Sequence, residues 1–128
     1  LFEKLIKEYP QEASVLNYYG YTLIERDIDI AKGQVLVEKA LSLEPETIAY
    51  LDSKAWGLYK QGSQLQDSSK IREALSILLE IQPQQMDDFY ILEHIARCYQ
   101  ALGRQEEFNA TLTEIKKLAP HHPIFKEK

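Results

Sequence analysis

The apolar residues of the chain recur with a helical period in three segments that align with one another. The segments are "LNYYGYTLIERD" (16–27), "LDSKAWGLYKQG" (51–62) and "LEHIARCYQALG" (92–103). Each begins with leucine and has a small residue four positions later and an apolar residue three positions beyond that. Such positions form one stripe along a helix, and the small residue lets a second helix approach closely. The pattern predicts three helices, each followed by a turn at a residue that favours turns: Asp27, Gly62 and Gly103.

Each of these segments is followed by a second amphipathic stretch that ends at a proline. These stretches are "GQVLVEKALSLEP" (33–45), "IREALSILLEIQP" (71–83) and "FNATLTEIKKLAP" (108–120), and "LFEKLIKEYP" (1–10) is a fourth copy without its partner. Proline lacks a backbone N–H and disfavours helix in the residue before it, so it ends each second helix. We therefore expect helices at about 1–9, 12–26, 30–43, 47–61, 69–81, 86–102 and 105–118.

The paired stretches resemble the tetratricopeptide repeat (TPR), a helix–turn–helix unit of about 34 residues. The aligned leucines Leu16, Leu51 and Leu92 are 35 and 41 residues apart. The third unit fits the repeat without gaps, and the first needs one extra residue near 28–30. The second needs about four, within "SQLQDSSK" (63–70), which we interpret as a longer loop between its two helices. The sequence of residues 50–62, "YLDSKAWGLYKQG", is similar to a variant of this repeat that is common in bacteria.

The resemblance implies an all-α superhelix, a TPR solenoid of about seven helices in antiparallel pairs. It implies a single domain over 1–128, with a half repeat at 1–10, repeats at about 12–45, 47–83 and 86–120, and a tail at 121–128. In this family the stack coils as a right-handed superhelix, and the first helix of each pair lines the concave side. Since the chain starts without methionine, in what looks like mid-helix, we expect a piece of a longer protein.

Trp56, the only tryptophan, raises the question of whether it is a core residue or part of a binding surface. It follows Ala55, so it lies about 100° round the helix from the stripe of Leu51, Ala55 and Leu58. The resemblance places it on the concave face, where the aromatic residues either bind a partner or fill a narrow groove between repeats. The glycine after it, Gly57, would let a neighbouring helix come close. The candidate partner-binding residues are Asn17, Tyr18, Tyr21, Asp52, Trp56, Tyr59, Tyr90, His94 and Arg97.

These residues favour a non-catalytic scaffold that binds a peptide or a partner helix of another protein in the concave groove. Tyrosine, tryptophan and arginine dominate binding hot spots because they offer rigid area with a polar tip. Tyr21, Trp56 and Tyr59 would anchor the partner, and Arg97 and Asp52 would set its orientation. The alternative is a structural spacer or self-association segment of a longer repeat protein. The lysine-rich clamp by which some members bind chaperone C-termini is not expected, because the matching positions hold Asn17, Tyr21, Ser53, Tyr90 and His94.

Composition and short motifs narrow the remaining functional classes. A net charge of −5 argues against a nucleic-acid partner, and no apolar run approaches the ~20 residues that span a bilayer. One cysteine, Cys98, excludes an internal disulfide, and we expect it to be buried between helices. His94 and Cys98 are four residues apart but provide only two ligands, so no metal site is expected.

No catalytic motif or cofactor-binding motif occurs, so neither an enzyme nor a cofactor is expected. Asp87 or Asp88 should cap the helix that carries Tyr90.

Overall fold

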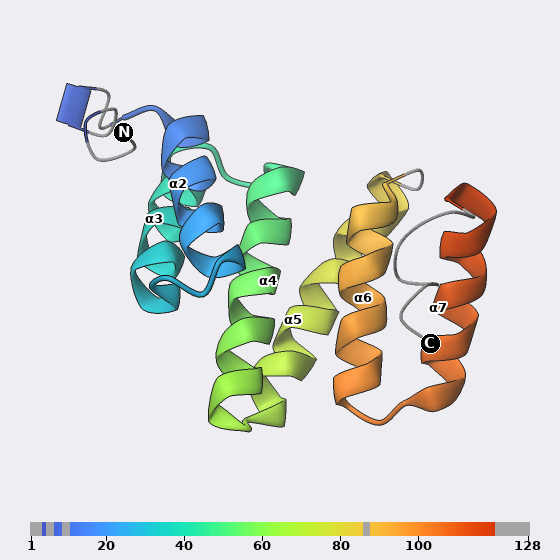
Figure 1. Ribbon diagram of the computed structural model, residues 1–128. Helices are drawn as coiled ribbons and strands as arrows, with labels where there is room; N and C mark the ends of the chain where they lie inside the picture. Colours follow the sequence, from blue (N-terminus) through green and yellow to red (C-terminus); the bar gives the residue numbers. More distant parts are fainter. Residues whose placement is uncertain (1–3, 5–6, 9–10, 86–87, 120–128) are drawn as a thin grey trace.

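The computed structural model describes residues 4, 7–8, 11–85 and 88–119, and these residues contain α-helices and no strand (Figure 1). The all-α expectation is therefore confirmed. The expected helix at 1–9 lies largely outside the described residues. The described residues contain the other six of the seven expected helices. The elements are α2 (Ala13–Glu25), α3 (Ile30–Leu43), α4 (Ile48–Leu65), α5 (Ser68–Ile81), the short 3-10 helix η1 (Gln82–Gln84), α6 (Phe89–Ala101) and α7 (Gln105–Leu118).

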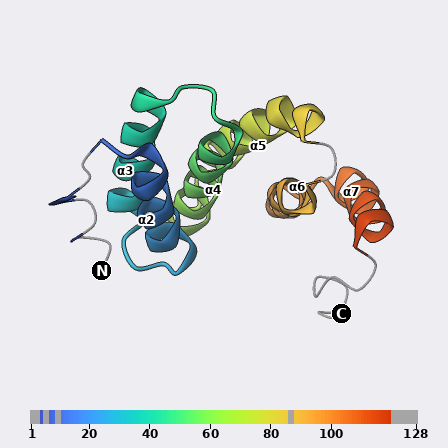
Figure 2. The same ribbon diagram turned by 90° about the horizontal axis from the view of Figure 1, so that it is seen from above.

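The helices pack in consecutive pairs, α2 with α3, α4 with α5 and α6 with α7, and each pair packs against the next. The first helices also contact each other in order, α2 with α4 and α4 with α6. Seen from above, α3, α5 and α7 follow the outer side of a curved row, and α2, α4 and α6 follow its inner side (Figure 2). The first helix of each pair therefore lines the concave face.

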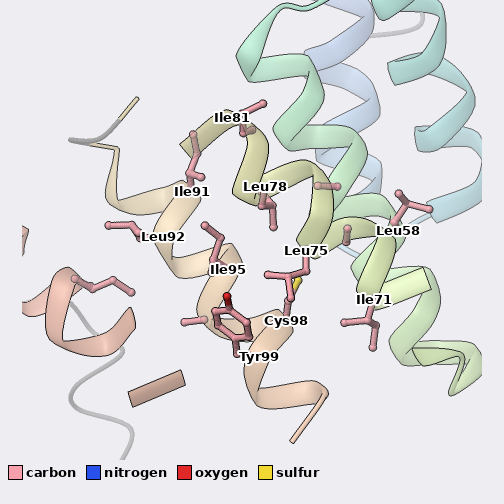
Figure 3. Packing of buried hydrophobic residues seen from close by; sticks show 14 residues of the cluster. Leu58, Ile71, Leu75, Leu78, Ile81, Ile91, Leu92, Ile95, Cys98 and Tyr99 are labelled. Carbon is pink, nitrogen blue, oxygen red and sulfur yellow. The ribbon is translucent and has the colours of Figure 1, made fainter. Parts of the chain in front are cut away.

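The largest hydrophobic cluster lies between α4, α5, α6 and α7 (Figure 3). The predicted stripe on α4 is confirmed, because Ala55 and Leu58 belong to this cluster and Leu51 packs against it. Cys98 is also buried here, as expected, and burial raises the pKa of its thiol to about 12. Two smaller clusters join α2, α3 and α4, and Trp56 belongs to one of them. The fold is thus held by contacts between neighbouring helices along the row.

The three first helices end in the same turn. In each, a residue adopts left-handed backbone, with φ of 53° at Asp27, 54° at Gln66 and 72° at Gly103. The next N–H then bonds a carbonyl five residues back, as in a Schellman motif. The N···O distances are 3.0 Å from Ile28 to Leu23, 2.9 Å from Asp67 to Gly62 and 2.9 Å from Arg104 to Tyr99. The predicted turns at Asp27 and Gly103 are confirmed, and the repeated turn fixes how each pair folds back.

The second turn is not where the sequence predicted it. Gly62 is helical, because α4 continues to Leu65 and has 18 residues, against 13 in α2 and in α6. The interpretation of 63–70 as a long loop is therefore wrong. Its extra residues add a turn to α4, and Asp67 then caps α5 by accepting from the N–H of Ser69. The helix continues because residues 63–65 include no residue that would break it.

Glycines allow close packing at three places between helices. A Cβ added at Gly20 would lie 2.7 Å from the carbonyl oxygen of Gly33, and one at Gly33 would lie 2.6 Å from that of Gly20. The backbones of α2 and α3 therefore touch at this pair, which confirms the expected close approach at Gly20. A Cβ at Gly57 would lie 3.0 Å from Cγ of Gln34, so the expected close packing is confirmed there too. Gly62 faces α5, where a Cβ would lie 2.8 Å from Cγ1 of Ile71.

Asp88 caps α6, as predicted. Its Oδ1 accepts hydrogen bonds from the backbone N–H groups of Tyr90 and Ile91, at 2.9 and 3.4 Å. This capping holds the first turn of α6, and with it Tyr90, at the edge of the concave face.

A search of the described residues finds no helix long and apolar enough to cross a membrane.

Candidate functional site: the concave face

All nine candidate partner-binding residues lie on α2, α4 and α6, around three open hollows. The central hollow, of about 840 Å³, is lined by side chains from all three helices. Five of the nine line it: Asn17, Tyr21, Asp52, Tyr90 and His94. A second hollow beside it contains Trp56, Tyr59 and Arg97. Tyr18 lines a third, on α2, which shares Asn17 and Tyr21 with the central hollow. The structure thus brings the predicted residues together, and their role in binding stays a prediction.

Trp56 lies at the concave face but is buried, with 7% of its surface exposed. Its indole stacks on the ring of Tyr59, with centroids 4.7 Å apart, and on the ring of His94, with centroids 4.1 Å apart. Its N–H donates a 2.7 Å hydrogen bond to Oε2 of Glu25 on α2. Trp56 is therefore neither part of the main core stripe nor an open surface residue. It joins all three first helices beneath the concave surface.

Glu25 was not singled out from the sequence, yet two of the candidate residues bond to it. Besides the indole of Trp56, its Oε2 accepts a 3.0 Å hydrogen bond from the hydroxyl of Tyr21, one turn earlier on α2. The i, i+4 spacing of Tyr21 and Glu25, and the need of a buried indole N–H for an acceptor, were the available signals. Burial, followed by the nearby charge of Glu25, raises the pKa of Tyr21 well above its ordinary value. Its phenol therefore stays neutral at physiological pH and donates to the carboxylate.

Asp52 and His94 form a second link between repeats. Oδ1 of Asp52 on α4 lies 2.8 Å from Nδ1 of His94 on α6. With the aspartate ionised, Nδ1 carries the hydrogen and donates the hydrogen bond to Oδ1. This bond holds the imidazole against Trp56. The first role of Asp52 is therefore a contact within the protein. Among the described residues, no group of three or more histidine, cysteine, aspartate or glutamate side chains could hold a metal ion.

Lys60 is another residue that sequence reasoning missed. Its ammonium lies 3.2 Å from Oδ2 of Asp27, in the turn after α2, and 5.7 Å from the centre of a Trp56 ring. The contact ties the extended end of α4 to the preceding repeat. No sequence signal marked it, because Lys60 and Asp27 are 33 residues apart.

The outer layer of the concave face differs from the buried Trp56 layer beneath it. Tyr18 and Tyr90 are 64% and 60% exposed, and Tyr21 is partly exposed. Oδ1 of Asn17 is buried and has no hydrogen-bond partner within the described protein. Exposed phenol rings can contact the side chains and backbone of another polypeptide.

Comparison with known proteins gives one informative match. No family model matches the chain. The chain is similar to TPR repeat-containing protein PA4667 of the bacterium Pseudomonas aeruginosa, with 37% identity over 71 residues. The match covers 56% of this chain and 12% of that relative, so the chain spans a small part of its length. Together with the paired helices, this similarity shows that the chain carries TPR-like repeats.

Proposed function

We propose that this helical-repeat scaffold is a non-catalytic module that binds a segment of a partner protein along its concave face. The observation that carries the proposal is the central hollow, which three successive first helices line with tyrosines and hydrogen-bond acceptors. An extended peptide or a short helix could contact α2, α4 and α6 at once there. Concave surfaces of this kind are the usual binding surfaces of repeat proteins.

The buried layer supports this proposal because it makes the surface rigid before a partner arrives. The indole of Trp56 bonds to α2 through Glu25, and Asp52 bonds to α6 through His94. A binding surface that is already ordered loses less conformational entropy on association, so more of the contact energy appears as affinity. Trp56 would thus contribute indirectly, by holding the repeats in register.

The partner itself would rest on the residues above that layer. Tyr18 and Tyr90 have the exposed ring area for direct contact, and Tyr21 lies partly exposed between α2 and the hollow. We therefore propose that tyrosines of α2 and α6 make the direct contacts and that Trp56 supports them from beneath, instead of contacting the partner itself.

An affinity-capture experiment tests the proposal. The immobilised chain and its Tyr18→Ala, Tyr90→Ala variant would be incubated with extract of the source cells, and the retained proteins identified by mass spectrometry. We expect the variant to lose the specific partner, with affinity reduced by more than about 2 kcal/mol, or about thirtyfold, since exposed tyrosines within an interface are typical hot spots.

The matched control is Leu79→Ala with Leu118→Ala. These leucines are 45% and 43% exposed on the second helices α5 and α7, so the double variant removes apolar area away from the concave face. It should retain the partner. Partners held equally by all three proteins would contradict the proposal and favour a structural spacer, provided that circular dichroism shows the same helix content for each.

A further inference from the structure

The central hollow has a one-sided charge. Its lining includes three carboxylates, from Glu46, Asp52 and Asp88, and neither lysine nor arginine. His94 is the one basic side chain in the lining, and its Nδ1 already faces Asp52. The second hollow differs, because Lys60 and Arg97 there offset part of the charge of its three acidic residues. A negative potential is therefore concentrated where α2, α4 and α6 meet.

The carboxylates of the central hollow keep oxygen atoms that can accept further hydrogen bonds. Within the described part of the chain, the three hydrogen bonds that the carboxylates of Asp52 and Asp88 accept all use Oδ1. Glu46 is exposed, in the turn before α4. A ligand group that only donates hydrogen bonds would match this set.

Two aromatic rings complete the lining. Tyr90 is exposed at one side and Tyr21 lies at the other, and each carries a phenol ring that can receive a cation on its face. The acidic field also reaches Tyr21: burial is the main cause of the raised pKa of its phenol, and the charges of Glu25, Asp52 and Glu93 add to it. Cationic side chains are the ligands that combine positive charge, donors without acceptors and affinity for aromatic faces.

We propose that the central hollow recognises a lysine or arginine side chain of the partner's bound segment. This inference rests on the proposed function and specifies its ligand. The cation would lie between Tyr21 and Tyr90, with its N–H groups directed to Asp52 and Glu46. Charge complementarity therefore selects a basic segment over an acidic or purely apolar one.

A peptide titration followed by NMR tests this inference without the natural partner. The probes are four peptides, acetyl-Ser-Ala-X-Ala-Ser-amide, in which X is arginine, lysine, norleucine or glutamate. We expect the arginine and lysine peptides to shift the amide signals of residues lining the central hollow and to saturate. Norleucine keeps the carbon chain of lysine without its charge, so it should bind at least about tenfold more weakly, and glutamate more weakly still. Raising the salt from about 0.05 to 0.5 M should weaken the cationic peptides.

Glu46→Gln provides the variant test, because Glu46 is exposed and its loss should leave the fold intact. It should weaken the arginine peptide severalfold. Glu106→Gln makes the same change on the surface of α7, outside the hollow, and should leave the affinity unchanged. Equal shifts from all four peptides, no shifts at all, or shifts confined to other surfaces would overturn the inference.

The outcomes also separate this inference from the proposed function. A captured partner that depends on Tyr18 and Tyr90 but binds through a segment without lysine or arginine would leave the function standing and refute the cation site. Selective binding of the cationic peptides, with no partner lost from the tyrosine variant, would support the cation site and refute the proposed function.

Discussion

Replacing Trp56 with alanine is expected to lower the free energy of unfolding by about 3–5 kcal/mol, as for other buried aromatic residues. The substitution removes a ring that is 7% exposed and stacks on Tyr59 and His94. It also leaves Glu25 without the indole N–H that joins α2 to α4. Urea denaturation followed by circular dichroism measures the change.

Two further variants make this prediction specific. Trp56→Phe keeps an aromatic ring but removes the hydrogen bond to Glu25, so we expect an intermediate loss of about 1–3 kcal/mol. Tyr90→Ala removes an exposed ring from the same face, and its effect should stay within about 0.5 kcal/mol. A Trp56→Ala protein as stable as Tyr90→Ala would mean that Trp56 is not what holds the repeats together.

The second large effect is expected at Gly33. In Gly33→Ala, the new methyl group would lie 2.6 Å from the backbone oxygen of Gly20 and 2.7 Å from Cγ1 of Ile24. The helices must move apart, because backbone atoms in the middle of α2 cannot yield as a side chain can. Overpacking of this kind costs about 1–3 kcal/mol, and the strain must exceed the ~1 kcal/mol by which alanine favours helix over glycine. We expect a net loss of stability of about 2 kcal/mol in thermal or urea unfolding.

Gly57→Ala is the matched control on α4. Its added methyl would meet Cγ of Gln34 at 3.0 Å and Cδ1 of Ile24 at 3.2 Å, and both are side-chain atoms that can shift. The gain in helix propensity should then balance the crowding to within about 1 kcal/mol. If Gly33→Ala is no less stable than Gly57→Ala, the backbone contact between α2 and α3 is not as close as described.

The sequence was sufficient to predict the helices because their signals are local. Prolines and repeated apolar stripes set the bounds of α3 and α7, which agree with the predicted 30–43 and 105–118. The concave placement of Tyr21 and Trp56 followed from the resemblance to TPR units, and the structure places both on the inner helices. Periodicity and prolines therefore account for the elements, and the resemblance accounts for the side that each one faces.

The prediction failed where a residue has two possible uses. Gly62 favours a turn by conformation, but it also allows a close contact, and here α5 packs against it within the continuing helix α4. The turn residue is Gln66 instead, which adopts a left-handed backbone conformation although it is not a glycine. Only the packing of α4 on α5 decides between these uses, and no local pattern reports it.

The links beneath the concave face were beyond sequence reasoning for a different reason. Trp56 and Glu25 are 31 residues apart, and His94 and Asp52 are 42 apart. Each pair meets only because successive repeats stack in register. Sequence spacing can place such residues on one face of a helix, but the choice of partner on the next helix depends on the angle and separation of the repeats.

Site-specific photo-crosslinking tests the central claim, that the concave face binds a partner polypeptide, most directly. The photoreactive amino acid p-benzoylphenylalanine would replace Tyr90 on the concave face or, as the control, Leu79 on α5, both of which are exposed. The account predicts a crosslink from position 90 to a segment of the captured partner, and none from position 79. Crosslinks from position 79 alone, or from neither position to any partner, would contradict it.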